Sequence, residues 1–174
     1  KAADFELDGA YNVAGTQAFL VHRNPVESKG GMRVLVFRGT EVDDFRDLWA
    51  DLDAKLVRAN GGDAREKIHN GFQNAFERVR SEIEQDLKKN PDLPLYITGH
   101  SLGGALAIVA TWFIASNSLG ACYTFGGPRV GTVELGKRFK TPIYRVVNAA
   151  DYVARVPSVA IPSIIWALNT FFKW

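Results

Sequence analysis

One serine stands where the chain changes from strand-like to helix-like sequence, in the segment Gly99-His100-Ser101-Leu102-Gly103-Gly104. The residues before it, 95–98, are apolar and β-leaning, and the residues after it, 105–110, favour a helix. A serine on so sharp a turn must adopt a strained backbone conformation, which pushes its hydroxyl out of the fold. Glycines two positions before and after are needed because side chains there would collide with the neighbouring strand or helix. The segment therefore predicts a strand, an outward-facing serine and a helix.

The same turn indicates a chemistry. It directs the amide of Leu102 and the N-terminus of the following helix toward the space in front of Ser101, where a negative oxygen would be stabilised. The alternative is a glycine-rich connection in which Ser101 is an ordinary exposed serine. The flanking strand and helix favour the first interpretation, in which Ser101 is a nucleophile.

Composition excludes several other classes of function. The chain has 174 residues, 47% of them hydrophobic, and a net charge of +2, so we expect a single domain over residues 1–174. Basic residues do not form a stripe interleaved with aromatic residues, so we expect no nucleic-acid partner. The sequence shows no metal-ligating cluster and no phosphate-cradling loop, and we expect no metal and no cofactor. The apolar stretch Val159–Leu168 is interrupted by Pro162 and is too short to span a bilayer.

The hydrophobic pattern predicts an α/β fold. Residues 18–22 and 33–38 read as strands, and apolar residues recur at helical spacing between Asn70 and about Lys89. After the serine turn, residues 121–125 and 143–147 supply two further strands. Strands that alternate with helices favour a mostly parallel central sheet with helices on both faces. In such a sheet the functional site forms at the carboxyl ends of the strands.

A serine nucleophile needs a carboxylate that orients its histidine base, and in folds built on this turn the acid follows the serine in the chain. Asp151 and Glu134 are the acidic residues after Ser101. Asp151 comes shortly after strand 143–147, which places it at the same sheet edge as Ser101. Glu134 is expected at the surface start of a helix, as a solvated charge. Asp151 is thus the predicted acid, with a helix cap or turn residue as its alternative role.

The histidine base is the missing member. All three histidines, His22, His69 and His100, lie at or before position 100. His22 is expected as a surface or paired residue and His69 as a structural residue at a helix entrance. His100 adjoins Ser101, but adjacent side chains on a strand end point to opposite sides, so we expect it to pack behind the turn.

Six segments between Phe37 and Pro157 resemble one known family, in that family's order. They are Phe37-Arg38-Gly39-Thr40, Trp49-Ala50-Asp51-Leu52, His69-Asn70-Gly71-Phe72, the serine turn, Phe125-Gly126-Gly127-Pro128-Arg129-Val130-Gly131, and Arg145-Val146-Val147-Asn148-Ala149-Ala150-Asp151 with Pro157. This order is similar to that of the class 3 lipases, the fungal-lipase-like branch of the α/β-hydrolases.

The resemblance implies specific roles. Ser101 would be the nucleophile and Asp151 the orienting acid, while Thr40 and Leu102 would form the oxyanion hole. Residues 41–52 would be an amphipathic lid, or alternatively an ordinary surface helix. The implied partners are a lipid ester, an acylglycerol above all, and a lipid–water interface. Acyl transfer to an alcohol would use the same residues.

The sequence departs from the family after the acid. Family members continue to a segment that carries the catalytic histidine, whereas here residues 159–174 are apolar and contain none. We therefore expect a fragment, truncated at the C-terminus, of a longer enzyme that holds the complete triad. The alternative is an inactive lipase-fold module that binds lipid or a protein partner.

Overall fold

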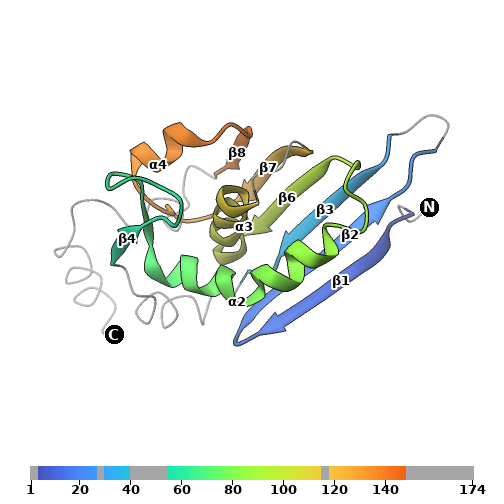
Figure 1. Ribbon diagram of the computed structural model, residues 1–174, viewed down its shortest axis with the longest axis horizontal. Helices are drawn as coiled ribbons and strands as arrows, with labels where there is room; N and C mark the ends of the chain where they lie inside the picture. The colour runs from blue at the N-terminus through green and yellow to red at the C-terminus, as the bar shows by residue number, and fades with distance from the viewer. Residues whose placement is uncertain (1–3, 27–29, 40–54, 115–117, 148–174) are drawn as a thin grey trace, which may run out of the picture.

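The computed structural model describes residues 4–26, 30–39, 55–114 and 118–147 (Figure 1). Every strand and helix that the hydrophobic pattern predicted in these ranges is present. They are β2 (Thr16–Arg23), β3 (Met32–Phe37), α2 (Asn70–Asp86), β6 (Leu95–His100), α3 (Leu102–Phe113), β7 (Leu119–Phe125) and β8 (Ile143–Val146). The helix whose start was expected at Glu134 is α4 (Val133–Arg138), and the structure adds three elements that the sequence analysis did not name: β1 (Glu6–Val13), β4 (Leu56–Arg58) and β5 (Lys67–His69).

The main sheet has the strand order β1-β2-β3-β6-β7-β8. The first three strands pair antiparallel, and β3, β6, β7 and β8 pair parallel to one another. The parallel part is the part that the alternation of strands and helices predicted. β4 and β5 form a separate antiparallel hairpin.

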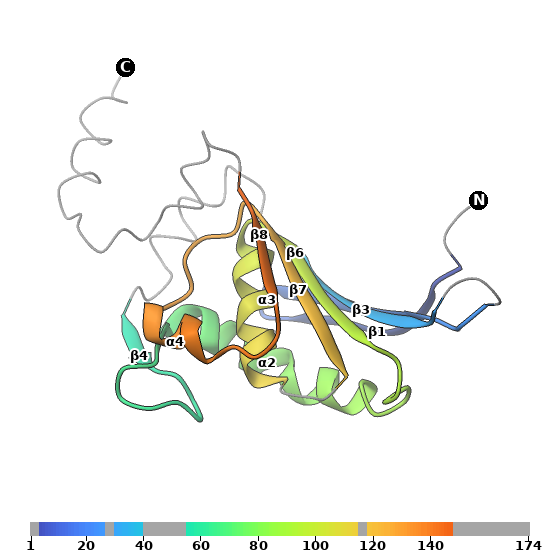
Figure 2. The same ribbon diagram turned by 90° about the horizontal axis from the view of Figure 1, so that it is seen from above.

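The core lies between the sheet and two long helices. Along β3 and β6 buried residues alternate with partly exposed ones, so one face of each strand contributes to the core. Leu35 and Ile97 point to that face and pack with Phe76 of α2 and Val109 of α3, all four with no exposed surface. Figure 2 shows α2, α3 and α4 together on this side of the sheet. Full burial of each such side chain contributes about 1.5–3 kcal/mol.

Strand β1 closes the antiparallel edge of the sheet and is tied to the core by a polar contact. The phenol of Tyr11 donates a 2.8 Å hydrogen bond to the carboxylate of Asp86, at the end of α2. Burial, followed by this bond, raises the pKa of Tyr11 above its ordinary value. The edge strand β1 is therefore held to α2 by a contact between residues that lie 75 positions apart in the sequence.

The parallel strands end at a common edge. In the register of the sheet Phe37 lies beside Gly99, His100 beside Phe125, and Phe125 beside Val146. Whatever follows β3, β6, β7 and β8 in the chain therefore begins at the same rim. This is the edge at which open parallel sheets place their functional sites.

Candidate active site

Ser101 adopts the strained backbone conformation that its sequence context predicts. Its φ is 53° and its ψ is −125°, between the last residue of β6 and the first of α3. Such a positive φ is uncommon for a residue with a side chain. The conformation is held in place because the amide of Ser101 donates to the carbonyl of Phe125 on the adjacent strand, at 2.9 Å. The turn is thus fixed by the sheet itself.

The glycines around Ser101 are present because backbone fills the space a side chain would need. A Cβ on Gly99 would collide with the backbone of Gly103, and a Cβ on Gly103 would collide with the carbonyl oxygen of Phe37. Gly104 is in contact with Gly127, whose Cα would lie 3.1 Å from a Cβ at position 104. Strand β3, the helix α3 and the loop after β7 therefore meet directly behind the serine.

The hydroxyl of Ser101 is not used as a helix cap. Serines at this position normally accept a hydrogen bond from an amide of the first turn, yet Ser101 makes no such side-chain bond. Its carbonyl instead accepts from the amides of Gly104, at 2.9 Å, and Ala105, at 3.4 Å. Within the helix this leaves the amides of Leu102 and Gly103 without an acceptor.

The electrostatics of this turn favour a negative charge. The first turn of α3 carries no acidic side chain that would offset the positive end of the helix dipole. Ser101 is 9% exposed, so a charge in front of it would be partly shielded from water. Together with the amide of Leu102, this arrangement is what an oxyanion requires.

Two of the predicted site residues, Thr40 and Asp151, lie outside the described residues, as does the lid candidate 41–52. Gly39, the residue before Thr40, does lie beside the turn: a Cβ on Gly39 would be 3.5 Å from the Cβ of Ser101 and would collide with the carbonyl oxygen of His100. Val147, the last described residue before Asp151, follows β8 at the same rim. The described chain therefore leads toward both residues from the edge where Ser101 lies.

The three histidines lie on β2 (His22), at the N-cap of α2 (His69) and at the end of β6 (His100). His22 is buried, and its Nδ1 lies 2.9 Å from the carboxylate of Asp8, as expected for a paired residue. His69 is the N-cap residue of α2, as expected. The expectation that His100 packs behind the turn is wrong. It is exposed opposite Phe125, because the buried side of β6 is taken by Leu95, Ile97 and Gly99.

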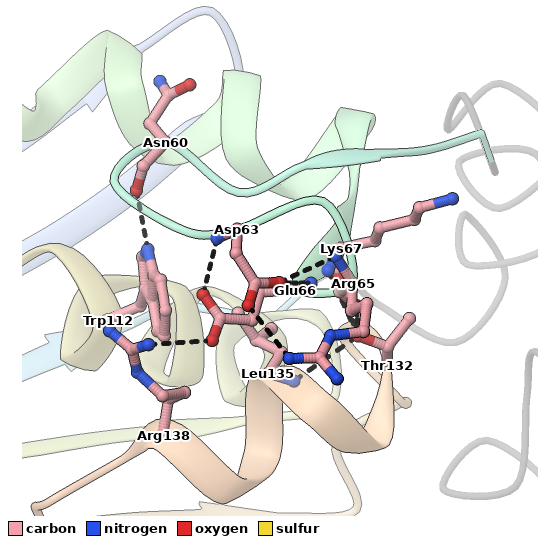
Figure 3. Close-up of polar contacts among 9 residues, drawn as sticks. All are labelled: Asn60, Asp63, Arg65, Glu66, Lys67, Trp112, Thr132, Leu135 and Arg138. Atoms are coloured by element: carbon pink, nitrogen blue, oxygen red, sulfur yellow. Dashed lines mark hydrogen bonds and ion pairs between the residues drawn. The ribbon is translucent and has the colours of Figure 1, made fainter.

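The β4–β5 hairpin begins directly after residues 40–54 and is anchored on α4 (Figure 3). Glu66, whose side chain is 4% exposed, forms a 3.2 Å ion pair with Arg138. The hydroxyl of Thr132 donates to the carbonyl of Arg65, at 2.8 Å, and accepts from the amide of Lys67, at 3.1 Å. These bonds fix the loop between β4 and β5 and the start of β5 against α4 and its N-cap residue.

The loop after β7 is the part of the site that sequence analysis described only through the family resemblance. Gly126 donates to the carbonyl of Val146, at 2.9 Å, and the guanidinium of Arg145 donates to the carbonyl of Gly127, at 2.8 Å. At its far end the backbone amide of His69 donates to the carbonyl of Val130, at 2.9 Å. No local pattern would show the contact between Arg145 and Gly127, because they lie 18 positions apart with helix α4 between them.

Cys122 and Glu134, the other residues considered from the sequence, lie where a structural role is expected. Cys122 is fully buried, and burial raises the pKa of its thiol to about 11, so it is no nucleophile at neutral pH. Glu134 lies in the first turn of α4, as expected for a surface helix start.

In the part of the chain that the structure describes, no three His, Cys, Asp or Glu side chains are grouped to hold a metal. None of the described helices is long and apolar enough to cross a membrane.

Known proteins share this arrangement. The chain is 32% identical to a lipase from Rhizopus niveus over 141 residues, which cover 71% of this chain and 34% of that protein. It is 30% identical to the chloroplastic phospholipase A1-Igamma1 of Arabidopsis thaliana over 128 residues, or 66% of this chain and 24% of the relative. The chain thus spans about a third or less of the length of these curated relatives.

The structure of the chain is also similar to solved structures of lipases. The structure superimposes on the triacylglyceride lipase of Rhizomucor miehei with a TM-score of 0.75 and 26% identity, over 92% of this chain and 63% of that one. It therefore has the α/β-hydrolase fold of the fungal lipases. The family described as Lipase (class 3) matches residues 34–160, which include the serine turn and the loop after β7. This chain belongs to the class 3 lipase family.

Proposed function

We propose that the protein containing this chain is a serine carboxylic-ester hydrolase of lipase type. Its substrates are acylglycerols or related lipid esters at a lipid–water interface. The observation that carries the proposal is the turn at Ser101, where a positive φ, a hydroxyl that makes no capping bond and an amide of Leu102 with no acceptor in the described helix occur together. Membership of the class 3 lipase family supports it, as do relatives named as lipase and phospholipase A1.

The proposed reaction begins at Ser101. Its oxygen attacks the ester carbonyl carbon, and the carbonyl oxygen becomes an oxyanion held by the amide of Leu102 and by Thr40. Each donor of this kind contributes about 10²–10³ in turnover. The histidine base takes the proton of the Ser101 hydroxyl during the attack and gives it to the departing alcohol oxygen when the intermediate collapses, which leaves an acyl-enzyme. Water then attacks the acyl group, and the fatty acid leaves with Ser101 restored.

Asp151 is the proposed acid, and the register of the sheet makes this role geometrically possible. It follows Val146 by five residues, a stretch that reaches about 17 Å at most. The ends of β8 and β6 are two strand spacings apart, or about 10 Å. Asp151 therefore has enough chain to approach Ser101 while leaving room for an imidazole between them.

The base must be a histidine that this chain does not carry after Ser101. His22 and His69 are held in structural contacts, and the chain spans about a third or less of the length of its curated relatives, so we propose that the base is a histidine of the intact protein outside residues 1–174. The sequence of the intact gene tests this directly, because a histidine within the few dozen codons after position 174 is expected. Its absence would favour an inactive module that binds lipid.

The test of activity uses the intact protein and a short-chain nitrophenyl ester. We expect hydrolysis that is abolished in Ser101→Ala, while Ser118→Ala, a change at a described serine away from the turn, retains it. Removal of a nucleophile from a serine triad lowers turnover by about 10⁶. Equal rates for the wild type and Ser101→Ala would refute the proposed function.

A further inference from the structure

The loop after β7 supports the serine turn from behind. A Cβ on Gly127 would lie 3.3 Å from the Cα of Gly104, so the two backbones are in direct contact. The amide of Gly104 is bonded to the carbonyl of Ser101, at 2.9 Å. A displacement of the loop at Gly127 would therefore act on the turn that sets the position of the nucleophile.

Strand β8 holds this loop at two adjacent points. One is a backbone bond from Gly126 to the carbonyl of Val146, at 2.9 Å. The other is the 2.8 Å bond from the guanidinium of Arg145 to the carbonyl of Gly127. Gly126 has a φ of 58°, so the chain turns sharply here and does not continue the sheet. The second bond thus ties Gly127 to β8, although the pairing of β7 with β8 ends at Phe125.

Arg145 lies at an exposed position of β8, with part of its guanidinium shielded from water. Burial lowers the pKa of its guanidinium from the ordinary value, and the nearby cation of Arg129 lowers it further. Lysine could carry the charge, but it lacks the rigid planar donor fork with which arginine fixes an acceptor.

Arg145 also lies on the strand that precedes the proposed acid in the sequence. It lies on β8, and the proposed acid Asp151 follows six residues later. Its partner Gly127 touches the turn of the proposed nucleophile. One side chain thus connects the strand that leads to the acid with the support of the serine.

We propose that Arg145 is a positioning residue for ester hydrolysis. Its bond to Gly127 fixes the loop after β7 and thereby the position of the turn that carries Ser101. This inference rests on the proposed function. Misplacement of reacting groups by about 1 Å can cost about 10² in rate. We therefore expect Arg145 to act on the chemical step and hardly at all on substrate binding.

The experiment compares Arg145→Met and Arg145→Lys in the intact protein. The probe is a fluorophosphonate, whose rate of bond formation with Ser101 reports the activated hydroxyl without requiring a lipid surface. We expect the Met variant to react about 10²-fold more slowly and to lose kcat on a soluble ester by a similar factor, with KM changed less than about threefold. The Lys variant should fall between the two, and added guanidinium ion at millimolar concentration should restore part of the rate of the Met variant.

Arg138→Met is the matched control. Arg138 is also an arginine in a polar contact, the 3.2 Å ion pair with Glu66, but it lies on α4 away from the serine turn. We expect this variant to lose stability and to keep the wild-type labelling rate. Circular dichroism and thermal unfolding of all variants establish that the rates belong to folded protein.

The outcomes separate the two proposals. A folded Arg145→Met variant that is labelled within twofold of the wild-type rate would overturn the positioning role and leave the proposed function standing. Rates that fall in Arg145→Met and Arg138→Met in proportion to lost stability would also overturn it, since both residues would then be merely structural. If the wild type is labelled no faster than Ser101→Ala, the proposed function fails, and the positioning role fails with it.

Discussion

The contact between α3 and β3 behind Ser101 gives a quantitative prediction for Gly103→Ala. A Cβ at position 103 would collide with the carbonyl oxygen of Phe37 and lie 2.9 Å from the carbonyl carbon of Arg38. Both are backbone atoms at the end of a strand, so neither can rotate away as a flexible side chain could. Either the first turn of α3 or the end of β3 must move.

The magnitude follows from two opposing effects. Alanine is favoured over glycine in a helix by about 1 kcal/mol, which would stabilise the variant. Insertion of a methyl group into packed surroundings costs about 1–3 kcal/mol, and the cost lies at the upper end where the obstacle is backbone. We therefore expect a net loss of about 1–2 kcal/mol in the free energy of unfolding, or about 2–8 °C in Tm.

The assay is thermal and urea unfolding of the intact protein, with Gly136→Ala as the matched control. Gly136 also lies in a helix, α4, but a Cβ there would meet nothing within 4 Å. That variant should gain up to about 1 kcal/mol from helix propensity alone. The reasoning would be refuted if Gly103→Ala were as stable as the wild type, because the close approach of α3 to β3 would then be absent.

Three further predictions concern stability and reactivity. Tyr11→Phe should lose about 1.5–3 kcal/mol at pH 7, the range for hydrogen bonds to charged groups. Because the folded protein raises the pKa of Tyr11, the wild type should lose this advantage above about pH 10, where the phenol ionises in the unfolded chain, so pH-dependent melting curves of the two proteins should converge there. Arg33→Leu should lose at least about 3 kcal/mol in urea unfolding, because the buried guanidinium donates to the carbonyls of Leu87 and Leu93, and wild-type stability would contradict this. Cys122 should resist a disulfide reagent at pH 8 until the protein unfolds, and rapid labelling of the native protein would contradict its burial.

The elements that sequence predicted are those whose pattern is local. The apolar spacing over α2 and the β-branched residues of β3 and β6 are sufficient to indicate a helix or a strand without knowledge of the partner. Strand β1 escaped notice because Glu6–Val13 mixes polar residues with Gly9, and what holds it is the pairing with β2 and the bond from Tyr11 to Asp86. The short β4–β5 hairpin likewise depends on the distant Thr132.

In the candidate site, too, the features set by neighbouring residues were predictable, whereas those set by distant residues were not. The conformation of Ser101 follows from the glycines and the strand-to-helix change beside it, so it was predictable. The position of His100 was predicted wrongly because the buried face of β6 is taken by Leu95, Ile97 and Gly99, which leaves the face opposite to them, where His100 lies, exposed. The link from Arg145 to Gly127 joins two strand ends, and a sequence contains no local trace of such a contact. The roles of Thr40 and Asp151 remain predictions that rest on family resemblance and on the residues that lead to them.

The central claim is that the amide of Leu102 and the hydroxyl of Ser101 face one reaction centre. A crystal structure of the intact protein after reaction with a phosphonate ester measures this most directly. The account predicts a phosphorus bonded to the Ser101 oxygen, with a phosphoryl oxygen about 2.7–3.1 Å from the Leu102 nitrogen and the Asp151 carboxylate on the same rim. An adduct on another residue, or a phosphoryl oxygen directed away from α3, would contradict it.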